Sequence, residues 1–179
     1  GFNSLYTATT GGNNTAYGSE SLYFSTGTGN TGIGSGAGRL MTSGSNNTAV
    51  GNNAQVDVAA NSNQIRIGDQ SVVLATTKVA WTTSSDARYK EHIRTIPLGL
   101  NLISKLRPVD YLRRDNKKEN NGPMPETLET GFIAQEVLQT LKELGYEKSG
   151  MISKDDNGYY GMRYNDLLAP MVKAIQEQQ

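Results

Sequence analysis

The residues best suited to chemistry lie in one short segment, Trp81–Lys90. Within it a serine, an aspartate, an arginine and a lysine follow the pattern S-D-x-R-x-K: Ser85, Asp86, Arg88 and Lys90. A serine hydroxyl becomes a nucleophile when a neighbouring base removes its proton, and an uncharged lysine amine can be that base. The segment therefore predicts a Ser-Lys dyad, with Ser85 as the nucleophile and Lys90 as the general base.

The nearest target of such a nucleophile is the peptide bond before it. A serine Oγ can approach to about 3 Å from the carbonyl carbon that precedes its own nitrogen, a near-attack distance. Attack by Ser85 on the Ser84 carbonyl would turn the Ser84–Ser85 amide into an ester, which water would then hydrolyse. Lys90 accepts the proton only as the uncharged amine, a form that burial and the positive charge of Arg88 would both favour. A polar linker, in which Ser85 and Asp86 cap a turn, is the alternative.

The spacing of the two dyad residues sets a geometric condition. Residues five apart face each other on neither a straight helix nor a straight strand. Either the backbone bends between Ser85 and Lys90, or Lys90 comes from a neighbouring copy of the chain. In the second case assembly itself would switch the reaction on.

Composition excludes most other chemistry. The chain has 179 residues, no Cys and a single His. It therefore has no disulfide, no thiolate metal site, no cysteine nucleophile and no multi-histidine zinc site, so we expect no metal and no cofactor. His92 lies in the charged segment Glu91–Arg94, where a solvated histidine is expected rather than a catalytic one. No G-x-S-x-G elbow and no G-x-x-x-x-G-K-[ST] phosphate loop occurs.

Charge and hydropathy exclude two classes of partner. The 17 basic residues balance the 17 acidic ones, whereas a nucleic-acid or anionic-membrane binder needs a basic excess. No apolar run approaches the ~20 residues of a membrane span, and the start of the sequence lacks the basic and apolar regions of a signal peptide. We therefore expect no nucleic-acid partner and no membrane insertion.

The composition changes sharply at the serine-containing segment. Residues 1–80 hold 13 of the 20 glycines but only 6 of the 34 charged residues, and residues 81–179 hold the other 28 charges. This change predicts two domains with a boundary there, residues 1–80 and residues 81–179.

The first half repeats a short motif. Asn-Thr-x-x-Gly or a close variant begins at Asn14, Asn30, Asn47 and Asn63, at intervals of 16, 17 and 16 residues. A flexible Gly/Asn linker has no reason to keep such a period, whereas a repeated supersecondary unit does. The apolar runs that end at Gly predict strands of about four residues, with Gly and Asn at the corners. We interpret residues 1 to about 75 as a repetitive, β-helix-like shaft.

The small apolar content of each repeat favours an oligomer. Burial gives about 0.8 kcal/mol per CH₂ group, which hardly offsets about 1–2 kcal/mol per residue for ordering the backbone. A single coiled chain would therefore have a poor core. Several identical chains around one axis would point their apolar side chains at one another and pair their edge strands, so the sequence predicts a homotrimer.

The second half has the pattern of an α+β domain. Apolar spacing, turn residues and proline positions predict its elements in order. They are a helix over 98–106, a strand over 109–113, a loop over 115–127, a strand over 128–133, a helix over 133–144 with Gly145 as its cap, a hairpin over 151–164 around Asp156-Asn157-Gly158, and a terminal amphipathic helix that starts near Asn165 or Asp166 or is kinked at Pro170.

Four ordered motifs in residues 82–179 carry a resemblance to a known family. They are Ser85-Asp86-x-Arg88-x-Lys90, Leu106-Arg107-Pro108-Val109-x-Tyr111, Gly131-Phe132-Ile133-Ala134-Gln135-Glu136-Val137 and Tyr164-x-x-Leu167. Together they resemble the self-cleaving intramolecular chaperone domain of bacteriophage tail spikes and tail fibres, shared by endosialidase spikes, neck appendage proteins and L-shaped tail fibres. The first half is similar to the Asn-Thr-Ala-x-Gly repeats of trimeric phage fibres and bacterial surface adhesins.

The resemblance implies a function for each half. The C-terminal domain would drive trimerisation and folding of the shaft and then release itself by cutting the Ser84–Ser85 bond. Ser85 would be the nucleophile and Lys90 the base, while Asp86 and Arg88 would only position them. Some members bind ATP, but no matching phosphate motif occurs here.

The resemblance also implies a location. The protein would fold in the host cytoplasm and belong to the tail of a virion, with any receptor contact upstream in the fibre. The alternative is a non-enzymatic receptor-binding or adhesin tip of a trimeric fibre.

Overall fold

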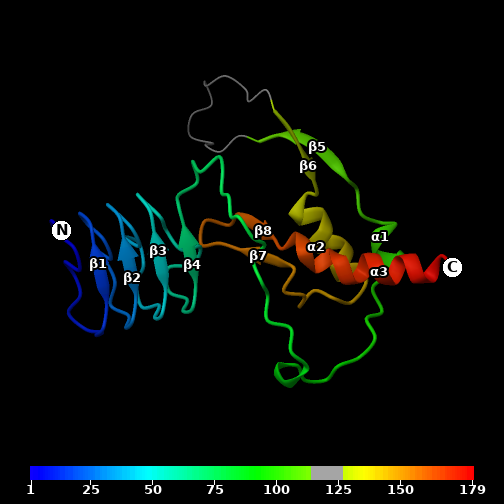
Figure 1. Ribbon diagram of the computed structural model, residues 1–179, viewed down its shortest axis with the longest axis horizontal. Coiled ribbons are helices and arrows are strands. Elements are labelled where there is room, and N and C mark those ends of the chain that lie inside the picture. The colour runs from blue at the N-terminus through cyan, green and yellow to red at the C-terminus, as the bar shows by residue number, and fades with distance from the viewer. Residues whose placement is uncertain (114–126) are drawn as a thin grey trace. The chain divides into compact units, whose positions relative to one another are not determined.

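The structure, a computed structural model, describes residues 1–113 and 127–179 (Figure 1). The chain divides into two compact units, Gly1–Ala75 with Asp155–Gly158, and Thr76–Lys154 with Tyr159–Gln179. The predicted loop over 115–127 lies, except for its last residue, outside the described residues. Within the described ranges, no helix has the length and apolar character needed to cross a membrane.

The N-terminal unit is a coil that carries one short strand per turn. The strands form a single parallel sheet in chain order: β1 (Thr15–Tyr17), β2 (Thr31–Ile33), β3 (Thr48–Val50) and β4 (Ile65–Ile67) (Figure 1). Each lies at one of the predicted repeats, so the prediction of short repeated strands is confirmed. Since parallel neighbours are joined by a full turn of chain, the unit is a β-solenoid.

The register corrects the alignment of the fourth repeat by one residue. Thr15, Thr31, Thr48 and Ile65 are successive partners, so the coils are 16, 17 and 17 residues long. Gln64, not Asn63, therefore lies beside Asn47. Asn63 instead occupies a corner with φ 63°, a left-handed conformation that asparagine tolerates better than most residues.

The corners explain the glycines that end each motif. The residue after each strand has a positive φ, between 75° and 132°, at Gly18, Gly34, Gly51 and Gly68. Residues with a Cβ rarely adopt these angles, so glycine is the residue that lets the chain turn there. Gly and Asn supply most of the positive-φ positions of the solenoid, as predicted, and Leu5, Glu20 and Leu22 are the exceptions.

The solenoid has its own interior, in contrast to the expected packing between chains. Its buried apolar residues are Leu22, Ala37, Met41, Ala49 and Ala54. Gly32 lies among them, and a Cβ there would collide with the Leu22 side chain. Because the central residues of β1 to β3 are Ala16, Gly32 and Ala49, these coils approach closely and a thin core closes within one chain. The strands likewise pair within one chain, from β1 to β4, and pairing of the edge strands with neighbouring chains stays a prediction.

Asparagine side chains fasten each coil to the next. The Oδ1 of Asn30 accepts a hydrogen bond from the Asn47 N–H (2.9 Å), and its Nδ2 donates to the Gly44 carbonyl (2.7 Å). Asn14 and Asn47 make the same pair of bonds one coil earlier and one coil later. Asn30 and Asn47 are fully buried, so these bonds satisfy polar groups that water cannot reach.

These asparagine hydrogen bonds form a ladder through Asn14, Asn30 and Asn47, and this ladder ends at the fourth coil. The side-chain amide of Gln64 turns back to its own coil, accepting from the Val58 N–H (3.1 Å) and donating to the Val58 carbonyl (2.6 Å). Arg66 takes the β4 position that is paired with Ala49 in β3, and its Nε donates to the Gly68 carbonyl (2.9 Å). A repeat array needs such a polar terminal unit, so the fourth coil caps the solenoid.

We expect Asn30→Ala to destabilise the solenoid strongly. The substitution leaves the Asn47 N–H and the Gly44 carbonyl without their partners in a buried site, a loss of about 2–4 kcal/mol in the free energy of unfolding. Denaturant unfolding followed by circular dichroism measures this loss. The control is Asn52→Ala, at an exposed position. Equal losses in the two variants would contradict a stabilising ladder.

The C-terminal unit has the predicted order of elements. It contains α1 (Leu100–Ile103), β5 (Val109–Leu112), β6 (Leu128–Gly131), α2 (Ala134–Glu143), β7 (Ile152–Lys154), β8 (Tyr160–Met162) and α3 (Leu168–Glu177), with single 3₁₀ turns η1 (Ala87–Tyr89) and η2 (Tyr164–Leu167). β5 pairs with β6, and β7 with β8, both antiparallel. α1 is shorter than the predicted helix over 98–106: it begins after Gly99, which offers no side-chain cap, and it ends at Ile103.

One apolar core joins these elements. Leu98 and Leu102 meet Val137 and Leu141 of α2, together with Met151 and Leu167. α1 packs against α3, and α2 packs against β7 and β8 (Figure 1). Val137 and Leu141 belong to the predicted helical stripe, and Gly145 ends that helix with φ 74° as expected.

Candidate functional site

Ser85 and Lys90 meet within one chain. The Lys90 Nζ donates a hydrogen bond to the Ser85 Oγ over 2.7 Å. The η1 turn lies between them, closed by hydrogen bonds from the Tyr89 N–H to the Asp86 carbonyl (3.1 Å) and from the Lys90 N–H to the Ala87 carbonyl (3.0 Å). The backbone therefore bends as the five-residue spacing required, and a base from a neighbouring copy is not needed for this contact.

Asp86 and Arg88 form a clamp across the same turn. Asp86 is the N-cap of η1, and its Oδ1 accepts from the Arg88 N–H (2.8 Å) and from the Arg88 Nε (3.0 Å). Its Oδ2 accepts from the Arg88 Nη2 (2.9 Å). The side-chain and then the backbone hydrogen bonds from Arg88 hold the pKa of Asp86 below its usual value, and the Asp86 carboxylate raises the pKa of Arg88.

The dyad is open to water in the single chain. All residues from 70 to 95 are exposed, including Ser85 and Lys90. The expected burial of Lys90 is therefore wrong for a single copy. The Arg88 charge is paired with Asp86 instead of being left free to act on Lys90. His92 is also exposed, in a left-handed conformation with φ 53°, in keeping with the solvated histidine that its charged surroundings predict.

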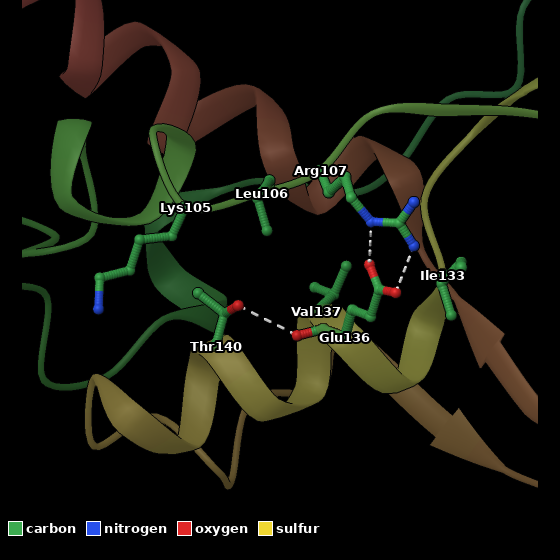
Figure 2. A pocket seen from close by; sticks show the side chains of 7 residues that line it. All are labelled: Lys105, Leu106, Arg107, Ile133, Glu136, Val137 and Thr140. Atoms are coloured by element: carbon green, nitrogen blue, oxygen red, sulfur yellow. Dashed lines mark hydrogen bonds and ion pairs between the residues drawn. The ribbon is translucent and has the colours of Figure 1, made fainter.

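The second and third motifs are joined by an ion pair. Arg107 follows α1 and Glu136 lies in the first turn of α2, and Figure 2 shows the guanidinium and the carboxylate facing each other with two hydrogen bonds. Arg107 lowers the pKa of Glu136, and Glu136 raises the pKa of Arg107. The space beside the pair is about 20 Å³, room for about one water molecule. The pair therefore fastens α2 to the chain before β5 and leaves no room for a ligand.

The third and fourth motifs meet at Tyr164. Its hydroxyl accepts a hydrogen bond from the Phe132 N–H (3.2 Å), and the two rings lie 6.2 Å apart. These residues line an open groove of about 440 Å³ with Pro108, Val109, Thr130 and Gly131. The last three motifs thus form one scaffold. Among the described residues, no group of three or more His, Cys, Asp or Glu side chains is arranged to hold a metal ion.

Comparison with protein families identifies the domain. Residues 85–146 match the family model of the S74 peptidases, described as the chaperone of endosialidase. The chain carries a chaperone of endosialidase domain. No curated protein matched the chain. Domains of this family are intramolecular chaperones, typically self-cleaving in phage fibres, and the family name implies an autoproteolytic serine peptidase.

The match to the chaperone of endosialidase family covers three of the four motifs. It begins at Ser85 and ends at Tyr146, so it includes the dyad segment, the Arg107 motif and the Glu136 motif. The Tyr164 motif and α3 lie beyond it. Arg107 and Glu136 each belong to one of these motifs, but the motifs alone did not predict that the two residues pair. They lie 29 residues apart, so no local spacing rule shows the pair.

We expect the Arg107–Glu136 pair to make the chaperone domain less stable in acid. Because the pKa of Glu136 is lowered on folding, its contribution is present above about pH 4.3, the usual value for glutamate, and is lost as pH falls through the lower folded value. Glu136→Gln should lower the melting temperature at pH 7 and reduce its fall between pH 5 and 3. Thermal unfolding at several pH values measures both, with the exposed Glu147→Gln as control. Parallel curves for Glu136→Gln and the native chain would contradict this role.

Proposed function

We propose that this chain is the C-terminal part of a phage tail fibre or spike, whose chaperone domain assembles three copies and then releases itself by cutting the Ser84–Ser85 bond. The contact of 2.7 Å between the Lys90 Nζ and the Ser85 Oγ carries this proposal. The family match supports it, because its first residue is also the first residue of the fragment that the cut would release.

The chemistry uses only the chain and one water molecule. Uncharged Lys90 takes the proton of the Ser85 hydroxyl, and Oγ attacks the Ser84 carbonyl carbon through a five-membered ring. The C–N bond breaks, and the proton passes to the Ser85 nitrogen, which leaves an ester between Ser84 and the Ser85 Oγ. Water then adds its hydroxyl to the Ser84 carbonyl and its proton to Oγ. The products are a carboxylate at Ser84 and an intact Ser85 with a free amino group.

Assembly supplies the condition that the single chain lacks. Lys90 must be uncharged to act, yet it is exposed to water in one copy. Removing a group from water disfavours its charged form. Neighbouring copies that cover residues 70–95 would exclude water from the dyad, so cleavage would follow assembly.

The C-terminal helix supports self-association. Leu167, Pro170 and Ala174 of η2 and α3 are buried within the unit. An adjacent stripe of the helix is apolar too, with 46–60% of each side chain exposed at Leu168, Met171, Val172 and Ile175. This i, i+3, i+4, i+7 spacing is that of a helix that packs against other helices. The same face on two further copies would cover it.

The solenoid has a second apolar surface. The outward column of its sheet consists of partners in register, of which Tyr17, Ile33 and Ile67 are exposed and Val50 is half-buried. This column has one side chain on each of four three-residue strands, a small surface for an interface that needs roughly 800 Å² per partner to be stable. The solenoids therefore need the chaperone domains to bring them together.

A removable domain suits such a repetitive shaft. Similar coils on neighbouring chains can slip by one repeat with little loss of energy, and docking three chains costs translational and rotational entropy. A domain that trimerises first fixes the alignment and raises the effective concentration of the solenoids. Its release afterwards removes the contacts that began assembly, so that the durability of the shaft becomes kinetic.

Denaturing gel electrophoresis of the purified chain tests the proposal. Self-cleavage predicts two pieces, residues 1–84 and 85–179, that accumulate after synthesis without any added protease. A receptor-binding or adhesin tip, whose exposed segment 70–95 is merely a linker, predicts one undivided chain. An undivided chain in correctly assembled material would overturn the proposal.

A further inference from the structure

The bend that joins Ser85 to Lys90 has little packing to hold it. Every residue from 70 to 95 is exposed, so no apolar core covers the turn in the single chain. The hydrogen bonds within Asp86–Lys90 are the contacts that hold its shape. Two of them are the backbone bonds of η1, and a single 3₁₀ turn has poor hydrogen-bond geometry. The shape of the turn therefore depends on side chains.

Asp86 provides most of those side-chain bonds. Its carboxylate caps the turn at the Arg88 N–H, which is an orphan donor of the first turn. It also holds the Arg88 guanidinium by two further bonds, at 3.0 and 2.9 Å. One carboxylate thus ties both the backbone and the side chain of Arg88 to the start of the turn. Lys90 leaves the other end of the turn with an extended backbone, φ −119° and ψ 129°, and reaches back to Ser85.

We propose that Asp86 and Arg88 are positioning residues, whose mutual clamp fixes the η1 turn and so holds the Lys90 amine against the Ser85 hydroxyl. This inference rests on the proposed function. In this role the two charges cancel each other locally, and Arg88 acts through the shape of the backbone instead of through its field at Lys90.

The electrostatic role predicted for Arg88 makes the opposite prediction. If Arg88 favoured the uncharged amine by its charge, Asp86→Ala would free that charge, speed cleavage and move the midpoint of its pH profile to lower pH. A positioning role predicts that Asp86→Ala slows cleavage at every pH and leaves the midpoint unchanged. A role only in general stability would move the melting temperature together with the rate.

Graded variants test the clamp. Asp86→Ala removes the cap and the ion pair, and misplacing the base should slow cleavage about 10- to 100-fold. Asp86→Asn keeps an acceptor for the Arg88 N–H, so its rate of cleavage should fall less than that of Asp86→Ala. Arg88→Lys loses the planar guanidinium that makes two hydrogen bonds to Asp86. Its rate of cleavage should also lie between those of the native chain and Asp86→Ala. Glu91→Gln, which alters an exposed charge beside Lys90, is the control and should cut at the native rate.

The experiment follows the fraction cut with time by denaturing electrophoresis at several pH values, with oligomeric state and melting temperature measured on each variant. The native chain must cut and Ser85→Ala must not, or the proposed function itself fails. Once that holds, native rates in both Asp86→Ala and Arg88→Lys would overturn the clamp. A faster Asp86→Ala, or a shifted midpoint, would overturn it in favour of the electrostatic role. If Asp86→Ala does not assemble, the milder variant Asp86→Asn is used instead. Equal cleavage rates in Asp86→Asn and Glu91→Gln would then overturn the clamp.

Discussion

Replacing Ser85 by alanine will leave the chain uncut while it still assembles. Ser85→Ala removes the only atom that can attack the Ser84 carbonyl in this mechanism, so cleavage should fall below detection rather than slow by a factor. The assembling surfaces, including the exposed face of α3, lie elsewhere in the sequence and are unchanged. Denaturing electrophoresis and light scattering on the same sample measure the two properties together.

Ser84→Ala is the matched control for this variant. It removes a neighbouring hydroxyl of the same exposed segment but keeps the carbonyl that Ser85 attacks. Ser84→Ala should therefore be cut normally. A cut Ser85→Ala chain would contradict the assignment of the nucleophile, and a monomeric or aggregated one would show that cleavage precedes assembly.

Replacing Lys90 by methionine will nearly abolish cleavage. Lys90→Met keeps the length and much of the apolar stem of the side chain but removes the amine that lies 2.7 Å from the Ser85 Oγ. Loss of a general base slows reactions about 10²- to 10⁴-fold. The rate constant for the appearance of the 85–179 piece measures the effect.

Two further variants separate a base from a positive charge. Lys90→Arg keeps a cation and a hydrogen-bond donor, yet arginine does not lose its proton in proteins, so this variant should be as slow as Lys90→Met. Lys78→Met, at an exposed position in the same segment, should cut at the native rate. An active Lys90→Arg would show that the charge of Lys90 matters and not its basicity.

The repeats show how far spacing alone predicts a solenoid. The regular positions of Asn14, Asn30 and Asn47 predicted the strands, because the same contacts recur from one coil to the next. The fourth repeat was misplaced because Asn63 and Gln64 are adjacent amides and either fits the spacing. The pairing of β3 with β4 and the hydrogen bond from the Gln64 N–H to the Asn47 Oδ1 decide between them, and both depend on three-dimensional register.

The closure of the solenoid core within one chain was not predicted from the sequence. Counting apolar side chains predicted a poor core, and the core is indeed small, centred on Leu22 and Met41. The count leaves out the buried side-chain bonds of Asn30 and Asn47, which link the coils through backbone groups. These contacts stabilise a thin interior that the area estimate alone would reject.

The candidate site was partly predictable for a different reason. The bend between Ser85 and Lys90 follows from their spacing and from the ability of Asp86 to cap a turn. Whether Lys90 is buried depends on what packs over an exposed segment, and a local pattern holds no information on that. The Arg107–Glu136 pair was missed similarly, since its partners come together only when β5 and α2 are placed.

Intact mass spectrometry of freshly expressed protein, with and without hydroxylamine, tests the central claim most directly. We predict the masses of residues 1–84 and 85–179, the latter with a free amino group at Ser85. Hydroxylamine should capture the ester and leave the 1–84 piece heavier by one NH group, as a hydroxamate at Ser84. A single mass for all 179 residues, in material that has assembled into its stable oligomer, would contradict self-cleavage at Ser85.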